Sequence, residues 1–141
     1  MPHHITWLRL NHCQLTQIDT LYPVMDYLDI SANPITTIHF LPDTVWDYLV
    51  MDSLTVLASL QQKLLATRSI SIDYCQNAGI EDFLSYLRHY KRDYYSTQID
   101  ISARNSNLSY CPQFEADISR LDLSFNPITR VYSQGLSDTG Y

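Results

Sequence analysis

Glycine, cysteine and basic residues are all scarce in this chain of 141 residues. Only three glycines are present, and none of them forms the spaced glycine pattern of a P-loop or a dinucleotide-binding turn. Fifteen Asp and Glu outweigh nine Lys and Arg, giving a net charge of −6, which disfavours nucleic acid because phosphates require a basic surface. Apolar runs fall far short of the ~18 residues of a membrane-spanning helix, so no membrane partner is expected.

The three cysteines, Cys13, Cys75 and Cys111, are odd in number and form no Cys-x-x-Cys motif. This pattern does not build a disulfide framework, so we expect reduced thiols and an intracellular, reducing compartment. The first residues, MPHHITWLRL, lack the basic segment and apolar core of a secretion signal.

Motifs for catalysis are missing as well: the sequence has no HExxH and no GxSxG. Cys111 falls in SYCPQF, at an apolar repeat position before Pro112, and does not have the context of a catalytic thiol. The five histidines are scattered along the chain, at His3, His4, His12, His39 and His89. We therefore expect no enzyme activity, no metal and no cofactor.

A repeated phrase is what the sequence does contain: residues 27–38 read YLDISANPITTI and residues 120–131 read RLDLSFNPITRV. The shared pattern is two alternating aliphatic residues, an Asn three positions later, and two further aliphatic residues. The same pattern recurs in six units, whose first aliphatic residues are Leu8, Leu28, Leu49, Ile70, Ile99 and Leu121. The intervals between these residues are 20, 21, 21, 29 and 22.

This pattern resembles the leucine-rich repeat family over nearly the whole chain, because that family repeats at intervals of 20 to 29 residues. The Leu-Pro pair before the third strand resembles the short-repeat subtype of bacterial secreted effectors. The resemblance implies an α/β fold, a right-handed solenoid of about six repeats with a parallel sheet on its concave side. It makes residues 1–141 a single domain, with repeat strands near 7–11, 27–31, 48–52, 69–73, 98–102 and 120–124.

The segments between the strands are expected to form the convex side, some of them as extended chain and others as helices. LYPVMDYL and FLPDTVWDYL contain prolines that do not suit a helix interior, so these segments are expected to be extended. Residues 54–67 and 79–96 carry apolar residues at helical spacing, which predicts one or two helices. A longer helix at 79–96 would account for the interval of 29 residues.

The Asn of each unit is expected to form a structural turn ladder. In leucine-rich repeats, its side chain bonds backbone groups of neighbouring turns that stacking would otherwise bury. Asn105 falls one place late, which suggests an inserted residue, and Leu54 should interrupt the ladder. The expected ladder residues are Cys13, Asn33, Cys75, Asn105 and Asn126.

Strand residues that alternate with the core residues should form columns on the exposed concave face. Trp7, Tyr27 and Tyr48 should form a contiguous aromatic strip. The second column is expected to hold Arg9, Asp29, Val50, Ser71, Asp100 and Asp122, and the third Asn11, Ser31, Asp52, Asp73, Ser102 and Ser124. The aspartates Asp29, Asp52, Asp73, Asp100 and Asp122 should therefore spread into an acidic floor. Exposed aromatic residues beside charged ones are typical of protein-binding surfaces, so the expected partner is another protein.

These observations predict a non-catalytic protein–protein interaction module that binds through its concave face. From the resemblance we further expect an accessory or effector protein of a bacterial or viral pathogen. The alternative is a structural or assembly protein that oligomerises through uncapped solenoid ends. A closed homodimer through the C-terminal end is then expected, unless Leu136 and Tyr141 cover the last repeat. A third alternative is a regulatory subunit of a phosphatase or a ligase.

Overall fold

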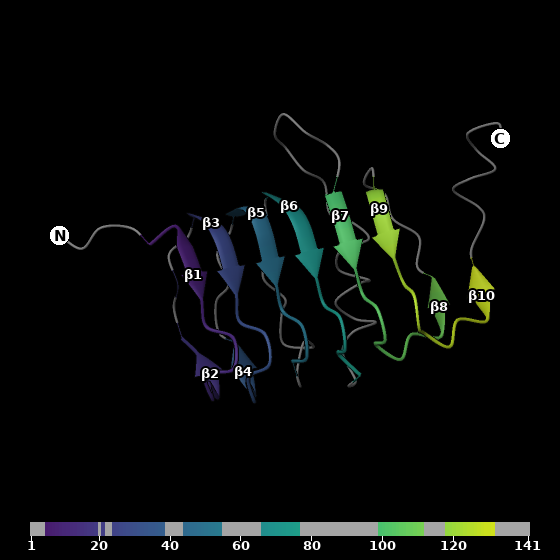
Figure 1. The fold of residues 1–141 in the computed structure, drawn as a ribbon, viewed down its shortest axis with the longest axis horizontal. Helices are drawn as coiled ribbons and strands as arrows, with labels where there is room; N and C mark the ends of the chain where they lie inside the picture. The colour runs from purple at the N-terminus through teal and green to yellow at the C-terminus, as the bar shows by residue number, and fades with distance from the viewer. Residues whose placement is uncertain are drawn as a thin grey trace.

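The computed structural model describes residues 5–19, 21, 24–38, 44–54, 66–76, 99–111 and 118–131. One parallel sheet of six strands runs through these ranges in the order β1-β3-β5-β6-β7-β9 (Figure 1). Its strands are β1 (Trp7–Arg9), β3 (Val24–Asp29), β5 (Thr44–Val50), β6 (Ala66–Ser71), β7 (Ile99–Ser102) and β9 (Ile118–Asp122). Two further parallel pairs join β2 (Gln17–Ile18) to β4 (Thr37–Ile38) and β8 (Tyr110–Cys111) to β10 (Arg130–Val131).

The chain is a parallel β-solenoid, as the repeat predicts. Strand order follows chain order, so each main strand lies beside the main strand of the next unit (Figure 1). The described ranges contain no helix, so the α/β assignment is not shown. Residues 55–65 of the first predicted helix, and the whole of the second at 79–96, lie outside the described residues. Residues 66 and 67 of the first predicted helix instead begin strand β6.

The core consists of the alternating aliphatic residues of each strand. Leu28, Leu49 and Ile70 pair in register across β3, β5 and β6, and their side chains are fully buried. Because successive strand side chains point to opposite faces, the residues between them remain on the outer face of the sheet. The outer face of the six-stranded sheet is called the sheet face below.

Three of the main strands, β3, β5 and β6, begin and end earlier than predicted. β3, β5 and β6 start at Val24, Thr44 and Ala66, about three residues before the repeat pattern, and all three end two residues before its predicted end. Irregular pairing between Met25 and Tyr27, and between Val45 and Tyr48, shifts the alternation at these strand starts. A β-bulge inserts an extra residue in one strand of a pair, so simple alternation could not reveal this extension.

The register of the fifth unit differs from the expected one by two residues. Ile101 pairs with both Ile70 and Leu121, so the fifth unit begins at Ile101 and not at Ile99. The interval before it is therefore 101 − 70 = 31 residues, and no residue is inserted after it. A slip of two residues keeps the same side chains facing inward, and the small Ala103 obscured the true pattern.

A residue in the left-handed backbone region stands at the same place in all six units, three residues after the last residue of the main strand. These residues are His12, Ala32, Ser53, Tyr74, Asn105 and Phe125, with φ between 50° and 61°. None of them is glycine, although this region costs most residues roughly 1–2 kcal/mol. The turn that this conformation makes aims the next residue, here called the slot residue, toward the neighbouring unit. The slot residues are Cys13, Asn33, Leu54, Cys75, Ser106 and Asn126.

Asn33 forms the hydrogen bonds expected of a slot asparagine. Its Oδ1 accepts from the backbone N–H groups of Cys13 at 2.9 Å and Leu15 at 3.1 Å in the preceding unit. Its Nδ2 donates to the carbonyl oxygens of Leu10 at 2.8 Å and Ile30 at 2.9 Å. The buried amide thus satisfies backbone groups of two units at once.

Asn126 repeats this arrangement at the last junction in a less buried setting. Its Oδ1 accepts from the N–H groups of Ser106 and Leu108, and its Nδ2 donates to the carbonyl oxygens of Ala103 and Leu123. Both slot asparagines therefore connect the unit that contains them to the unit before.

Ser106, and not Asn105, is the slot residue of the fifth unit, because the register places it opposite Asn126. Its Oγ accepts from the N–H of Cys75 at 3.1 Å and donates to the carbonyl oxygen of Ile72 at 2.9 Å. In the fourth unit the Sγ of Cys75 donates to the carbonyl oxygen of Met51 at 3.2 Å. Leu54, the slot residue of the third unit, is buried.

Candidate functional site

Three aromatic side chains from neighbouring strands meet on the sheet face and form the aromatic strip. Trp7 stacks on Tyr27, with ring centroids 4.6 Å apart and ring planes 14° from parallel. Tyr27 contacts Tyr48 in a tilted arrangement, with centroids 6.3 Å apart and planes at 58°. Trp7 is 57% exposed and Tyr48 is 52% exposed, while Tyr27 between them is half-buried. Burial, and next the charge of Asp29, raises the pKa of the Tyr27 hydroxyl.

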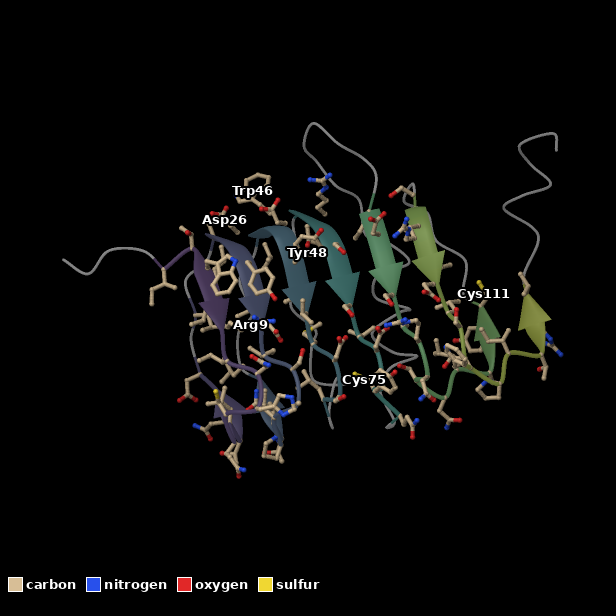
Figure 2. All side chains as sticks on the ribbon, in the orientation of Figure 1. Arg9, Asp26, Trp46, Tyr48, Cys75 and Cys111 are labelled. Atoms are coloured by element: carbon tan, nitrogen blue, oxygen red, sulfur yellow. The ribbon has the colours of Figure 1, made fainter. Side chains whose placement is uncertain are left out.

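An ion pair joins the first two strands of the aromatic strip. Its arginine, Arg9, lies further along the strands than Tyr48 (Figure 2). The Nε of Arg9 is 3.5 Å from Oδ2 of Asp29. The Arg9 side chain is 56% exposed, whereas that of Asp29 is 7% exposed. Oδ1 of Asp29 also accepts the backbone N–H of Ser31 at 3.0 Å. The charge that this pair presents to a partner is therefore the positive charge of Arg9.

Acidic residues border the strip on its other side, at the starts of the strands. Asp26 and Asp47, which directly precede Tyr27 and Tyr48, are exposed. Figure 2 shows Asp26 and Trp46 at the starts of the strands, on the side of Tyr48 away from Arg9. Simple alternation does not reveal these acids, because they lie in the irregularly paired part of β3 and β5.

The expected acidic floor is wrong as an exposed surface. Asp29 and Asp73 are buried, at 5% and 3% exposure, and Asp52, Asp100 and Asp122 are partly buried. The reason is that hydrogen-bond donors from the same unit or from a neighbouring unit satisfy the carboxylates at these positions, which allows them to leave water. Asp100 also changes place: it pairs with Ser69 and Arg120 in the column of the aromatic strip, and its carboxylate accepts the Ser119 hydroxyl.

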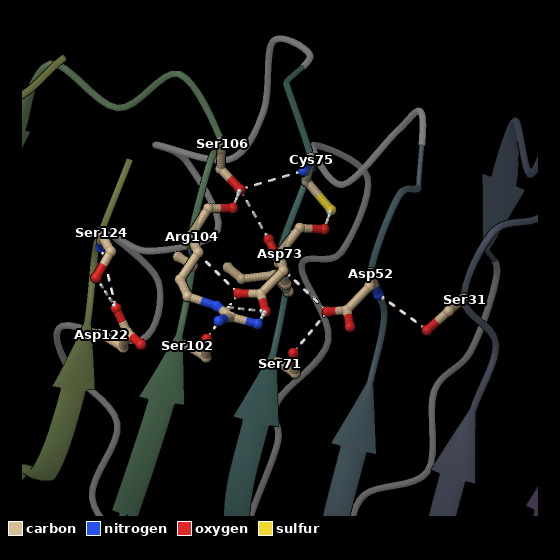
Figure 3. Close-up of polar contacts among 12 residues, drawn as sticks. Ser31, Asp52, Ser71, Asp73, Cys75, Ser102, Arg104, Ser106, Asp122 and Ser124 are labelled. Carbon is tan, nitrogen blue, oxygen red and sulfur yellow. Dashed lines mark hydrogen bonds and ion pairs between the residues drawn. The ribbon is translucent and has the colours of Figure 1, made fainter. Parts of the chain in front are cut away.

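The carboxylates of the partly buried Asp52 and the buried Asp73 form a carboxylate ladder that joins the third, fourth and fifth units (Figure 3). Oδ1 of Asp52 accepts the hydroxyl of Ser71 at 2.6 Å and the backbone N–H of Asp73 at 2.8 Å. Oδ1 of Asp73 repeats both bonds one unit later, to the hydroxyl of Ser102 at 2.6 Å and the N–H of Arg104 at 2.8 Å. These aspartates therefore stabilise the stack and are poorly placed to meet a partner.

Arg104 also lies on this face, although the expected register did not place it there. Its Nε and Nη2 both donate to Oδ2 of Asp73, at 3.1 and 3.0 Å. The hydrogen bonds and charge of Asp73 raise the pKa of the guanidinium. The correct register would have revealed Arg104, because it puts this residue directly after Asp73 in the third column.

Two other carboxylates have pKa values shifted in opposite directions. Burial raises the pKa of Asp52, although its hydrogen bonds to Ser71 and Asp73 oppose this effect. Hydrogen bonds from the hydroxyl and N–H of Ser124 lower the pKa of Asp122. Asp122 lies in the second column as expected, where it closes a turn within its own unit.

The thiols of Cys75 and Cys111 have environments that disfavour the thiolate. Burial raises the pKa of Cys75 to about 11, so this side chain remains a protonated hydrogen-bond donor at neutral pH. Burial also raises the pKa of Cys111, while Cys13 is exposed. Within the described ranges, no three His, Cys, Asp or Glu side chains gather as metal ligands would.

No known protein family, curated protein or solved structure matches this chain. In the part of the chain that the structure describes, no helix combines the length and apolar character needed to cross a membrane. The aromatic strip and its charged borders are accordingly the surface from which we infer function.

Proposed function

We propose that this chain is a non-catalytic leucine-rich repeat protein, wound to the right, that binds another protein through its aromatic strip. The observation that carries the proposal is the Trp7–Tyr27–Tyr48 contact, which packs two large exposed rings against Tyr27 on the sheet face. Tryptophan and tyrosine are the preferred anchors of protein interfaces. The family assignment is supported by the parallel sheet and by the slot bonds of Asn33 and Asn126.

The borders of the strip suggest the chemistry of the partner. Arg9 offers a cation on one side, and Asp26 and Asp47 offer anions on the other. A complementary partner has an apolar or aromatic centre, an acidic group facing Arg9 and a basic group facing the two aspartates. The buried Asp29 and Asp73 contribute no accessible charge, so salt should weaken binding modestly. We place the protein in a reducing compartment, where its three cysteines stay free.

The test is a selection of binding peptides from a displayed random library on the immobilised chain, with each isolate measured in solution. Trp7→Ala and Tyr48→Ala should each reduce affinity by about tenfold or more, as expected for interface anchors. Tyr74→Ala is the matched control, because Tyr74 is 54% exposed but lies in a turn away from the strip. Peptides whose affinity is unchanged by Trp7→Ala and Tyr48→Ala, or is reduced only by Tyr74→Ala, would place the binding surface elsewhere.

A further inference from the structure

The two ends of the solenoid repeat the core positions of its interior but leave them partly uncovered. Interior residues such as Leu49 and Ile70 are 0% exposed. Their equivalents in the first and last units are only partly buried; they are Leu8, Leu10, Leu15, Leu121, Leu123 and Ile128. β1 and β9 are the two edges of the main sheet, so among the described strands neither has a partner on its outer side.

Two backbone hydrogen bonds recur at every junction between neighbouring units. They show which donors and acceptors have no equivalent partner at the two ends of the described stack. The first runs from the N–H of Leu10 to the carbonyl oxygen of Asp29, and its last copy runs from Ala103 to Asp122. The second runs from His12 to Ser31, and its last copy runs from Asn105 to Ser124. The next donors in these two series are the N–H groups of Leu123 and Phe125. The acceptors that precede the two series are the carbonyl oxygens of Arg9 and Asn11.

We propose that a second copy of this chain supplies the missing unit, so that copies stack head to tail with β9 of one beside β1 of the next. Both junction bonds then continue, from Leu123 to Arg9 and from Phe125 to Asn11 of the second copy. The apolar positions also meet their equivalents: Leu121 covers Leu8, and Ile128 covers Leu15. This contact goes beyond the binding of a partner through the sheet face.

The charges of the two ends are complementary in this register. Asp122 occupies the second column, so it lies beside Arg9 of the second copy, as Asp29 lies beside Arg9 within one chain. Arg120 occupies the first column and lies beside Trp7 of the second copy. There the guanidinium can take the stacking position that Tyr27 occupies on the other face of the indole, which is a cation–π contact.

The slot residue of the first unit supports the same arrangement. Slot side chains bond the preceding unit: Nδ2 of Asn33 donates to Leu10, and Sγ of Cys75 donates to Met51 at 3.2 Å. Cys13 is exposed, and its Sγ makes a longer contact of 3.5 Å with Asn11 in its own turn. In the stack, Cys13 meets the carbonyl oxygen of Leu123 of the preceding copy, which is the bond that Cys75 makes at an internal junction.

A two-fold contact between two C-terminal ends cannot continue both the main sheet and the two-stranded sheets of the solenoid. It would pair β9 with β9 in antiparallel fashion and would carry the two β10 strands to opposite ends of the paired strands. Head-to-tail stacking instead brings β10 beside β2, each of which is the outer strand of its own two-stranded sheet (Figure 1). Because the contact joins two different surfaces, it does not close, and it continues into a filament.

The first experiment blocks each end separately and follows mass by sedimentation at increasing micromolar concentrations. Cys13→Glu places a charge on the N-terminal end, and Val131→Glu places one on the C-terminal end, where Val131 is 65% exposed. We expect the unmodified chain to grow beyond a dimer, each variant alone to remain monomeric, and their equimolar mixture to form a dimer and grow no further. Thermal unfolding of both variants checks that they remain folded.

Other outcomes overturn the proposal. An unmodified chain that stays monomeric at every concentration rejects self-association. A Cys13→Glu protein that still dimerises alone indicates a two-fold contact between C-terminal ends. A Val131→Glu protein that dimerises alone indicates a two-fold contact between N-terminal ends.

A second measurement does not depend on disrupting the contact. Adjacent slot residues lie in neighbouring turns of a stack whose strands are about 4.8 Å apart, within the Cα separation that a disulfide spans. Asn126→Cys in a Cys111→Ser background should therefore cross-link to Cys13 of the next copy under mild oxidation, giving a series of covalent oligomers. Adding Cys13→Ser should abolish these oligomers. Covalent dimers that persist with Cys13→Ser would join the introduced thiols of two copies to each other and would reject the head-to-tail contact.

Discussion

Arg104 and Asp73 are 31 residues apart in sequence, and two guanidinium nitrogens of Arg104 lie 3.1 and 3.0 Å from Oδ2 of Asp73. The carboxylate is buried, whereas the arginine side chain is 44% exposed. Asp73 belongs to the fourth unit and Arg104 to the fifth, so this pair joins the two units that flank the longest interval in the repeat. A buried carboxylate needs this compensation because desolvation penalises its charge.

Arg104→Met should therefore lower the free energy of unfolding, since it leaves the Asp73 charge with only neutral donors. Adding Asp73→Asn should restore most of the loss, because an amide oxygen can still accept from Ser102 and from the backbone N–H of residue 104. Urea unfolding followed by circular dichroism measures both effects. Arg68→Met, which changes an exposed arginine on β6, is the control and should change stability little. If the single and double variants lose the same free energy of unfolding, Arg104 stabilises the fold in some way other than by compensating the Asp73 charge.

The raised pKa of Asp52 predicts a stability that falls with rising pH. Folding favours the protonated carboxyl, so its contribution is fully present below the ordinary pKa of 3.8 and is lost as pH rises through the higher folded value. Asp52→Asn should consequently unfold at higher urea concentration than the unmodified chain at pH 7. The two proteins should converge as the pH falls below 3.8.

Asp47→Asn is the control for this titration, since it removes an exposed carboxylate from the same strand. It should leave most of the pH dependence in place. A parallel loss of pH dependence in both variants would assign the effect to net charge and not to the burial of Asp52.

Asn33→Ala should destabilise the fold by roughly 1–3 kcal/mol, because buried backbone groups of the first two units lose their partners. Asn33→Asp should be at least as damaging at neutral pH. Its carboxylate would still accept from Cys13 and Leu15, but it would face the carbonyl oxygens of Leu10 and Ile30 without a donor. Thermal unfolding compares both variants with Asn11→Ala, an amide outside the slot. An Asn33→Ala protein as stable as Asn11→Ala would contradict the structural role of the slot.

The left-handed residues before the slots predict a stabilising substitution. Phe125 has φ 61° and is 82% exposed, so its side chain gains little from packing while the backbone conformation disfavours it. Phe125→Asn should raise the free energy of unfolding by about 1 kcal/mol, because asparagine tolerates this region better. The reverse exchange at the equivalent position, Asn105→Phe, should lower it by a similar amount. Measurement below the concentration of self-association separates this effect from contacts made by the end of the solenoid.

The residue pattern of the repeat was enough to predict the stacked parallel strands and the aromatic strip. YLDIS and RLDLS encode inward and outward side chains by simple alternation, and spacings of 20 and 21 residues bring equivalent positions side by side. Trp7, Tyr27 and Tyr48 could be aligned for this reason, because each stands directly before the first aliphatic residue of its unit.

The fifth unit shows where the sequence alone was insufficient. Ile99, Ile101 and Ala103 are all inward residues, so alternation fits equally well with the unit starting at Ile99 or at Ile101. Only the pairing of Ile101 with Ile70 and Leu121 distinguishes the two. That choice also decides that Ser106 is the slot residue and that Arg104 reaches Asp73.

The sequence by itself determined a repeating parallel solenoid with an aromatic strip, because strand alternation and unit length are local properties of the chain. The tertiary structure decided which charges a partner can meet. Asp29 and Asp73 alternate with core residues as exposed side chains would, yet Arg9 and Arg104 of the neighbouring units supply partners that allow them to be buried. Arg9, Asp26 and Asp47 remain accessible around the strip. Burial of a polar side chain depends on donors from residues distant in sequence, which no pattern within one repeat records.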